Sequence, residues 1–279
     1  MINPETTETR LSPAPLRVPG VASIAIHGLL TGSGIEGTVL GTSSHAVWVQ
    51  AGGDVIVISI GRGTRLPNGV HLPETAGREL LRRVHQGSKV LIGHGRITIG
   101  NVSVTVPRWW DPRPALPAVT AEDLAARLVG LPSEVPGINT TSLGLALEVG
   151  SAGGILLSAK TLLGKGPGLT PEGDDLLTGA LGATRILGEA TGRERAVALI
   201  AGISRPLAEM AEVRTTAYSA ALLEMALRGR LVEPAGALLR ALAGRGDIAA
   251  SHLSLIRLGH TSGPALAAGI VLGAQALIQ

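Results

Sequence analysis

The sequence provides almost no aromatic side chains with which to fill a protein interior. Among 279 residues there are three Trp, one Tyr and no Phe, whereas apolar residues make up 45% of the chain and glycine occurs 39 times. The core must therefore be built from Ala, Leu, Val and Ile. Because glycine lets neighbouring backbones come close together, we expect helices that approach one another through small residues.

Hydrophobic periodicity divides the chain into two regions. Residues 21–106 contain short β-branched runs, such as DVIVISI, separated by Gly, Asn and Pro. This pattern predicts a small antiparallel β domain with one helix over 76–84. After the proline-rich segment PRWWDPRPALPAV, Leu and Ala recur at helical spacing. We therefore predict an α+β protein, with a flexible tail over 1–20, an antiparallel β domain over 21–115 and an all-helical domain over 116–279.

Breaks in the helical spacing indicate where each helix of the second region begins and ends. Thr, Pro and Asp precede several of the apolar runs, and Gly follows several of them, as expected for helix caps. The predicted helices cover residues 121–129, 141–163, 171–189, 193–210, 215–227, 234–242, 248–257 and 264–276.

Charge and composition argue against several classes of protein. The net charge is +3, the basic residues are scattered, and few aromatic residues accompany them, so we expect no nucleic-acid partner. The longest uncharged apolar stretch, 264–278, is shorter than the roughly 20 residues that span a bilayer, so we expect no membrane association. Cysteine is absent, which excludes disulfides and a cysteine nucleophile. The first 20 residues do not read as a signal peptide, and the expected location is the cytoplasm.

The segment GKGPGLTPEGDD, residues 164–175, contains the largest concentration of candidate functional residues. Thr170 suits the N-cap of a helix and Pro171 its first position, so free backbone N–H groups and the positive end of the helix dipole lie there. Gly166 and Gly168 let the backbone approach a ligand, and Lys165 adds a positive charge. A phosphate or carboxylate is the natural ligand of such a helix start.

The same segment places two acids, Asp174 and Asp175, on the first helical turn. They are candidates for holding Mg²⁺ or for accepting a proton. Neighbouring helical positions point about 100° apart, so one of the two is expected to face the ligand, and we choose Asp174. The alternative is that the glycines only make a tight connection and the acids only stabilise the helix dipole.

A second helix start follows Arg214, Thr215 and Thr216. Thr215 suits the cap of that helix, and the Arg214 guanidinium offers a planar fork for a carboxylate or phosphate. The alternative is a simple cap beside a surface arginine. Asn139, in the polar cluster NTTS at another helix start, is a lesser candidate for the same cleft.

A third helix start is GHTSGP, which contains His260, Thr261 and Ser262. Thr261 and Ser262 supply hydroxyls, and His260 is a candidate for proton transfer, although a histidine in a loop is often structural. If the three helix starts converge on one point, they build a preorganised cradle for an oxyanion or phosphate. We therefore predict that the three motifs form a single site.

The motifs resemble a known family. GKGPGLTPEGDD, RTTAYSA and GHTSG, in this order and with helices between them, are similar to the family of the AllH subunit of oxamate carbamoyltransferase. The segment VPRWWDPRP is similar to a Trp-Asp-Pro stretch of that family. The resemblance implies a role, together with other enzyme subunits, in moving a carbamoyl group between oxalurate and phosphate during allantoin breakdown in purine catabolism.

Three functions are compatible with these observations. The leading one is a carbamoyltransferase subunit that binds phosphate, carbamoyl phosphate, oxalurate or oxamate. On this hypothesis Lys165, Arg214 and the 166–168 backbone bind the anion, and Asp174, Asp175 and His260 transfer protons or hold Mg²⁺. The alternatives are a non-catalytic scaffold or regulatory subunit of a multi-subunit enzyme, and a stand-alone metal-dependent amidohydrolase.

Overall fold

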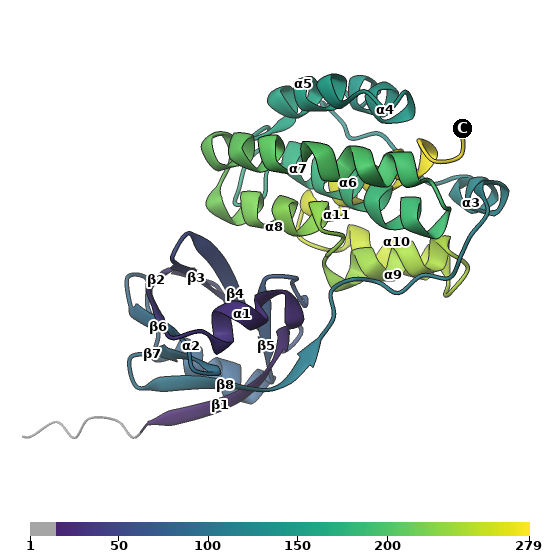
Figure 1. Cartoon of the computed structure of the whole chain (residues 1–279). Helices are drawn as coiled ribbons and strands as arrows, with labels where there is room; N and C mark the ends of the chain where they lie inside the picture. Colours follow the sequence, from purple (N-terminus) through teal and green to yellow (C-terminus); the bar gives the residue numbers. More distant parts are fainter. Residues whose placement is uncertain (1–14) are drawn as a thin grey trace, which may run out of the picture.

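The computed structural model describes residues 15–279 and shows a β-barrel beside a helical half (Figure 1). Most of the predicted 1–20 tail lies outside the described residues, and the described part continues directly into the first strand. The elements of the barrel half are β1 (Leu16–Ser23), the 3₁₀ helix η1 (Ile24–Ile26), α1 (His27–Thr31), β2 (Ile35–Thr42), β3 (Ala46–Ala51), β4 (Asp54–Ile60), β5 (Gly69–Leu72), α2 (Glu74–Leu81), β6 (Lys89–Gly93), β7 (Arg96–Ile99) and β8 (Val102–Trp110).

The predicted small antiparallel β domain is wrong, because the strands close into a mixed barrel. The strand order is β1-β5-β4-β3-β2-β6-β7-β8, and β8 returns to pair with β1. Two of the pairings, β1 with β8 and β4 with β5, are parallel. Closure leaves no strand edge exposed. The barrel is filled by aliphatic side chains, including Ile58, Ile92 and Val104, and contains no aromatic ring in its fully buried centre.

The helical C-terminal part is confirmed. Its elements are α3 (Ala121–Leu128), α4 (Thr141–Glu148), α5 (Ala152–Leu162), α6 (Glu172–Ala190), α7 (Glu194–Arg214), α8 (Ala217–Leu227), α9 (Glu233–Leu242), α10 (Ile248–Ile256) and α11 (Ser262–Gln275). The single helix predicted over 141–163 is divided into α4 and α5. Gly150 turns the chain there with a φ of +68°, and the Ser151 hydroxyl caps α5 by accepting from the Gly154 N–H.

Helices α6 and α11 form the centre of the helical half and contact each other through their backbones. A Cβ added to Gly269 would overlap the carbonyl oxygen of Leu176, and one added to Gly273 would overlap that of Ala180. The residue numbers of the contacting pairs increase together along α6 and α11, so the two helices are parallel. Their N-termini therefore lie side by side, as the expected close approach through small residues allows.

The barrel contacts the helical half mainly through α8 and the turn that follows it. Met225 of α8 packs against the barrel core. Beyond α8, the Glu233 N–H donates to the carbonyl of Arg65, and the Leu231 N–H donates to that of Pro112. The segment 61–68, between β4 and β5, is therefore held against the start of α9.

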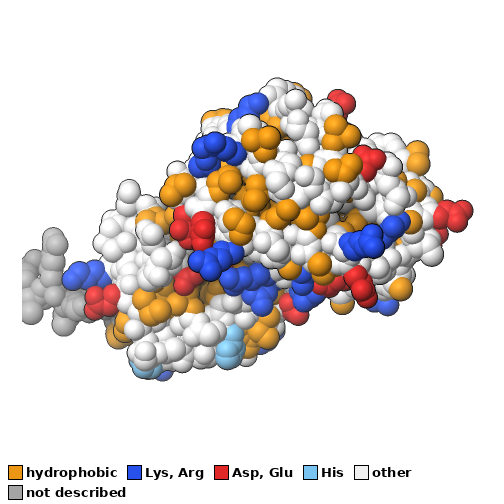
Figure 2. Space-filling model, turned by 45° about the horizontal axis from the view of Figure 1, so that its top comes forward, with side chains coloured by type: hydrophobic (Ala, Val, Ile, Leu, Met, Phe, Trp, Pro, Cys, Tyr) orange, Lys and Arg blue, Asp and Glu red, His pale blue; other side chains and the backbone are white. Residues whose placement is uncertain are grey.

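The surface carries both signs of charge. On the face shown in Figure 2, positive side chains are interspersed with negative and hydrophobic ones over both halves. None of the helices between residues 15 and 279 is long and apolar enough to cross a membrane.

Candidate functional site

The starts of α6 and α11 are joined by their side chains. The hydroxyls of Thr170, just before α6, and Ser262, the first residue of α11, are hydrogen-bonded at 2.7 Å. Because the two helices run in the same direction, the positive ends of both dipoles meet at this bond. The first and third sequence motifs therefore lie together.

Asp174 joins the Gly-rich segment to the second motif. Its side chain is fully buried. One carboxylate oxygen accepts from the Gly164 N–H at 2.7 Å, and the other accepts from the Thr215 hydroxyl. Both oxygens are thus occupied in holding the chain together. Asp174 therefore connects the Gly-rich segment to the start of α8 and does not line the cavity described below.

Two further contacts hold the second motif against the Gly-rich segment. The Thr216 hydroxyl donates to the Leu169 carbonyl at 2.6 Å and also caps α8 by accepting from the Ser219 N–H. Gly164 has a φ of +76° and packs against the carbonyl of Arg214 so closely that a Cβ would overlap it. The three motifs that the sequence singled out are therefore brought to one place.

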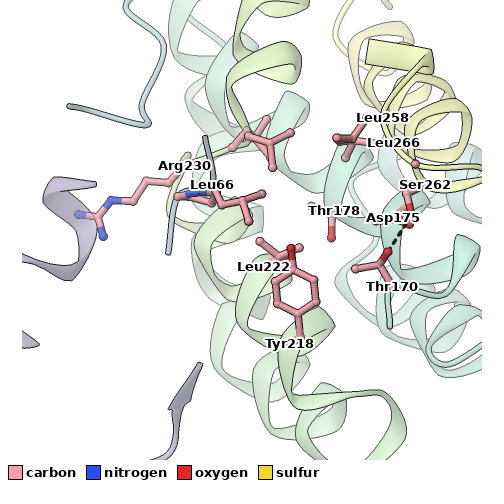
Figure 3. Close-up of a pocket in the computed structure, with 14 residues that line it drawn as sticks. Leu66, Thr170, Asp175, Thr178, Tyr218, Leu222, Arg230, Leu258, Ser262 and Leu266 are labelled. Carbon is pink, nitrogen blue, oxygen red and sulfur yellow. Dashed lines mark hydrogen bonds between the residues drawn. The ribbon is translucent and has the colours of Figure 1, made fainter. Parts of the chain in front are cut away.

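A cavity of about 190 Å³ opens beside the joined helix starts (Figure 3). Its walls come from α6, α8, α11, the turn before α9 and the barrel segment 61–68. Most of its surface is apolar, and the polar side chains are few. The lining residues are Leu66, Pro67, Thr170, Asp175, Thr178, Tyr218, Leu222, Arg230, Leu231, Val232, Leu258, Gly259, Ser262 and Leu266.

Asp175 is the acid of this cavity. Burial raises the pKa of its carboxyl to about 8, the nearby Ser262 and Thr170 hydroxyls lower it in part, and the charge of Asp174 raises it further. The carboxyl oxygen Oδ2 is buried and has no hydrogen-bond partner among the described residues. At neutral pH, Asp175 is therefore mainly a neutral carboxylic acid with an unused polar atom, which is the form that donates a hydrogen bond.

The sequence reasoning assigned no role to three polar residues that also line the cavity. In Figure 3 the Tyr218 hydroxyl and the Thr178 side chain point toward its middle, between Asp175 and the apolar wall. Arg230 lies at the far end, with its side chain extending away from Asp175, and its guanidinium has no ion-pair partner among residues 15–279. Tyr218 carried a usable signal, because it is the only tyrosine and falls within the motif RTTAYSA.

Several of the predicted ligand contacts lie outside the cavity. Lys165, Gly166 and Gly168 are exposed on the loop that precedes α6, and His260 is exposed on the loop that precedes α11. Thr261 is half-buried at the same place and does not line the cavity.

The side chains of Arg214 and Asn139 make hydrogen bonds to the backbone of the helical half instead of lining the cavity. The Arg214 guanidinium donates to the Lys160 carbonyl in the last turn of α5 at 3.2 Å. Asn139 accepts from the Thr141 N–H at 3.0 Å and so supports the start of α4. Of the residues predicted from the sequence, the structure places Thr170, Asp175 and Ser262 in the cavity.

The two acids do not form a good Mg²⁺ site. Both oxygens of Asp174 accept hydrogen bonds, and the carboxyl of Asp175 is held mainly protonated by burial. Hard cations require several free anionic or carbonyl oxygens. Within residues 15–279, no cluster of three or more His, Asp or Glu side chains is arranged to hold a metal ion. We therefore derive no chemical step through a metal.

The raised pKa of Asp175 predicts an unusual dependence of stability on pH. Between pH about 4 and about 8 the folded state keeps a proton that the unfolded state releases, so stability falls as pH rises, by up to about 1.4 kcal/mol per pH unit. Denaturant unfolding of the wild type and of Asp175→Asn from pH 5 to 9 measures this difference. The variant should gain stability relative to the wild type as the pH rises, and parallel curves would contradict the assignment.

The fold thus combines a closed β-barrel with a helical half, and a mostly apolar cavity lies at the start of two parallel helices. Residues 162–274 match the family described as oxamate carbamoyltransferase subunit AllH. The resemblance inferred from the three motifs is confirmed over this segment, which contains Asp175, Tyr218 and Ser262. The match does not include the barrel or the segment VPRWWDPRP. No solved structure matches the chain.

Proposed function

We propose that this chain is a subunit of a carbamoyltransferase and that its cavity binds the carbamoyl group of the substrate at Asp175. The proposal combines the family match over residues 162–274 with one observation in the structure. That observation is the buried, unpartnered carboxyl oxygen of Asp175 at the joined starts of α6 and α11. A buried polar atom without a partner costs free energy, which a ligand that completes the hydrogen bond recovers.

A carbamoyl group fits this position chemically. A protonated carboxyl group has one donor and one acceptor, and the carbamoyl group has a carbonyl acceptor and an amide donor. The ligand's anionic part, whether carboxylate or phosphate, then lies toward the side of the cavity that Arg230 lines. Oxalurate, oxamate and carbamoyl phosphate all contain both kinds of group.

In the direction of phosphorolysis, an oxygen of phosphate attacks the carbamoyl carbon of oxalurate. The bond between that carbon and the oxamate nitrogen breaks, and the nitrogen takes up the proton that phosphate gives up. The products are carbamoyl phosphate and oxamate. The requirements on the protein are to hold two anions together and to stabilise the oxygen that becomes negative. Other subunits are the expected partners in this proposal.

The second candidate, a scaffold or regulatory subunit, is favoured by a different observation. Lys165, Arg214 and His260, which the sequence suggested as anion ligands, do not line the cavity, and its wall is mostly apolar. In that case the cavity senses a small ligand, and the reaction takes place on another subunit.

Replacement of Asp175 by Leu tests the proposal in the complete multi-subunit enzyme. We expect kcat/KM for oxalurate phosphorolysis to fall by about 100-fold or more, because the polar anchor of the substrate is lost. Asp123→Leu is the matched control, since Asp123 is also an acid in a first helical turn but is exposed on α3. Full activity of Asp175→Leu in an assembled complex would instead support the scaffold function.

A further inference from the structure

Tyr218 supplies the cavity with a phenol, in addition to the aliphatic hydroxyls of threonine and serine that line it. It is the second residue of α8, and the hydroxyl of Thr216, two residues earlier, caps that helix. In Figure 3 its hydroxyl lies at the inner end of the ring, toward the middle of the cavity, and Asp175 lies to one side. The two side chains are not hydrogen-bonded to each other, so neither occupies the other's polar atom.

The phenol of Tyr218 stays protonated under all physiological conditions. Burial raises its pKa well above the usual value, and the negative form of Asp175 raises it further. A neutral phenol donates one strong hydrogen bond and can accept another. In a mostly apolar cavity, such a donor interacts more strongly with developing negative charge than it does in water.

The barrel contributes a contact to Tyr218. Trp48 of β3 lies edge-on to the Tyr218 ring, with centroids 6.2 Å apart and an angle of 75° between the planes. The Trp48 Nε1 is buried and makes no hydrogen bond of normal geometry, yet it lies near enough to the phenol to lower its pKa in part. The Trp48 ring thus packs against the Tyr218 ring from the barrel side.

We propose that the Tyr218 hydroxyl donates a hydrogen bond to the carbonyl oxygen of the bound carbamoyl group, beside Asp175, and that Trp48 of the barrel positions it. This inference rests on the proposed function. As the nucleophile attacks, that oxygen becomes negative, and two neutral donors stabilise it without bringing another anion into the cavity. A tyrosine paired with a protonated carboxyl group in an apolar site is a known way to build such an oxyanion hole.

The groups around Asp175 allow the neutral form to persist. On α6 the neighbouring charges are Asp174 and Glu172, both of which oppose ionisation. From α8 the cavity receives the neutral Tyr218, and the turn after α8 supplies Arg230, whose side chain extends away from Asp175. On the α11 and barrel sides the lining contains no charged side chain. The oxyanion is therefore stabilised by donors and not by a cation next to it.

The first test is Tyr218→Phe in the complete enzyme. We expect kcat to fall by about 100- to 1,000-fold, the usual effect of losing one oxyanion-hole donor, while KM for oxalurate changes by less than about threefold. The ring and its contact with Trp48 are kept, and the thermal midpoint of the variant shows that the fold is intact. An unchanged kcat in Tyr218→Phe, with Asp175→Leu inactive, would overturn this inference and leave the proposed function standing.

Asp175→Asn separates hydrogen-bond donation from proton transfer. Asn is a neutral donor of nearly the same shape, so we expect it to keep activity within about tenfold of the wild type and to remove the loss of activity above pH about 8. A loss as large as that of Asp175→Leu would show that the carboxyl transfers a proton, and the paired-donor proposal would be wrong.

Trp48→Leu tests the positioning role. If Trp48 acts through the phenol, this substitution lowers kcat in the wild type but has no further effect on kcat in Tyr218→Phe. Equal effects in both backgrounds would show that the indole only supports the packing of the barrel against α8.

Discussion

Gly269→Ala is expected to destabilise the protein by about 3 kcal/mol. The new Cβ would overlap the carbonyl oxygen of Leu176, which belongs to the backbone of α6 and has no other rotamer to adopt. The two helices must separate along their contact, and this loss of packing exceeds the roughly 1 kcal/mol by which Ala favours a helix over Gly. Denaturant unfolding measures the change in free energy.

Gly202→Ala is the matched control. Gly202 lies in the interior of α7, and a Cβ added there would meet no atom within 4 Å. The substitution should therefore stabilise the protein by about 0.5 to 1 kcal/mol through helix propensity alone. If Gly269→Ala is as well tolerated as Gly202→Ala, the backbone contact between α6 and α11 is not formed as described.

Asp174→Ala is expected to cost about 2 to 4 kcal/mol of stability. The change leaves the Gly164 N–H and the Thr215 hydroxyl without their acceptor, and hydrogen bonds to a charged group contribute about 1.5 to 3 kcal/mol each. The Gly-rich segment then loses its attachment to α6 and to the start of α8. Thermal and denaturant unfolding measure the loss.

Asp174→Asn and Thr215→Val are the controls for this effect. Asn keeps an acceptor for the Gly164 N–H and should cost less than Ala, whereas Val removes one hydrogen bond and keeps the shape of threonine. Because Asp174 holds the segment and does not face the cavity, we expect Asp174→Asn to lower kcat less than Tyr218→Phe does. If Asp174→Asn lowers kcat more than Tyr218→Phe does, Asp174 acts directly on the ligand, as predicted from the sequence.

Local sequence patterns predicted the strands and helices better than they predicted the pairing of strands or the division of one helical run into two helices. The alternation in DVIVISI and the spacing of Leu and Ala gave strands and helices close to those observed. Closure of the barrel depends on the parallel pairing of β1 with β8, between residues that lie far apart in the chain, and no local pattern indicates it. Gly150 and the cap residue Ser151 mark the division between α4 and α5, which the long apolar run conceals.

The sequence predicted which segments form the candidate site, but not which of their side chains line the cavity. The three glycine- and hydroxyl-rich helix starts converge as predicted, but among them a side chain caps only α8, and the cap is Thr216 rather than the expected Thr215. The direction of a side chain depends on tertiary neighbours, so Arg214 reaches Lys160, and Asp175 rather than Asp174 reaches the cavity. Arg230 and the barrel residue Trp48 gave no signal in the sequence, since the fold alone brings Arg230 to the cavity and Trp48 against Tyr218.

The backbone contact between α6 and α11 has a consequence for how such a protein can change over time. The floor of the cavity rests on glycines that accept almost no substitution, so it is nearly fixed. Part of the opposite wall is formed by Leu66 and Pro67, in a connection between two strands that can change length and sequence without disturbing the helix pair. Changes in the shape of the cavity are therefore expected to arise by exchange of this connection, while the contact between α6 and α11 is inherited unchanged.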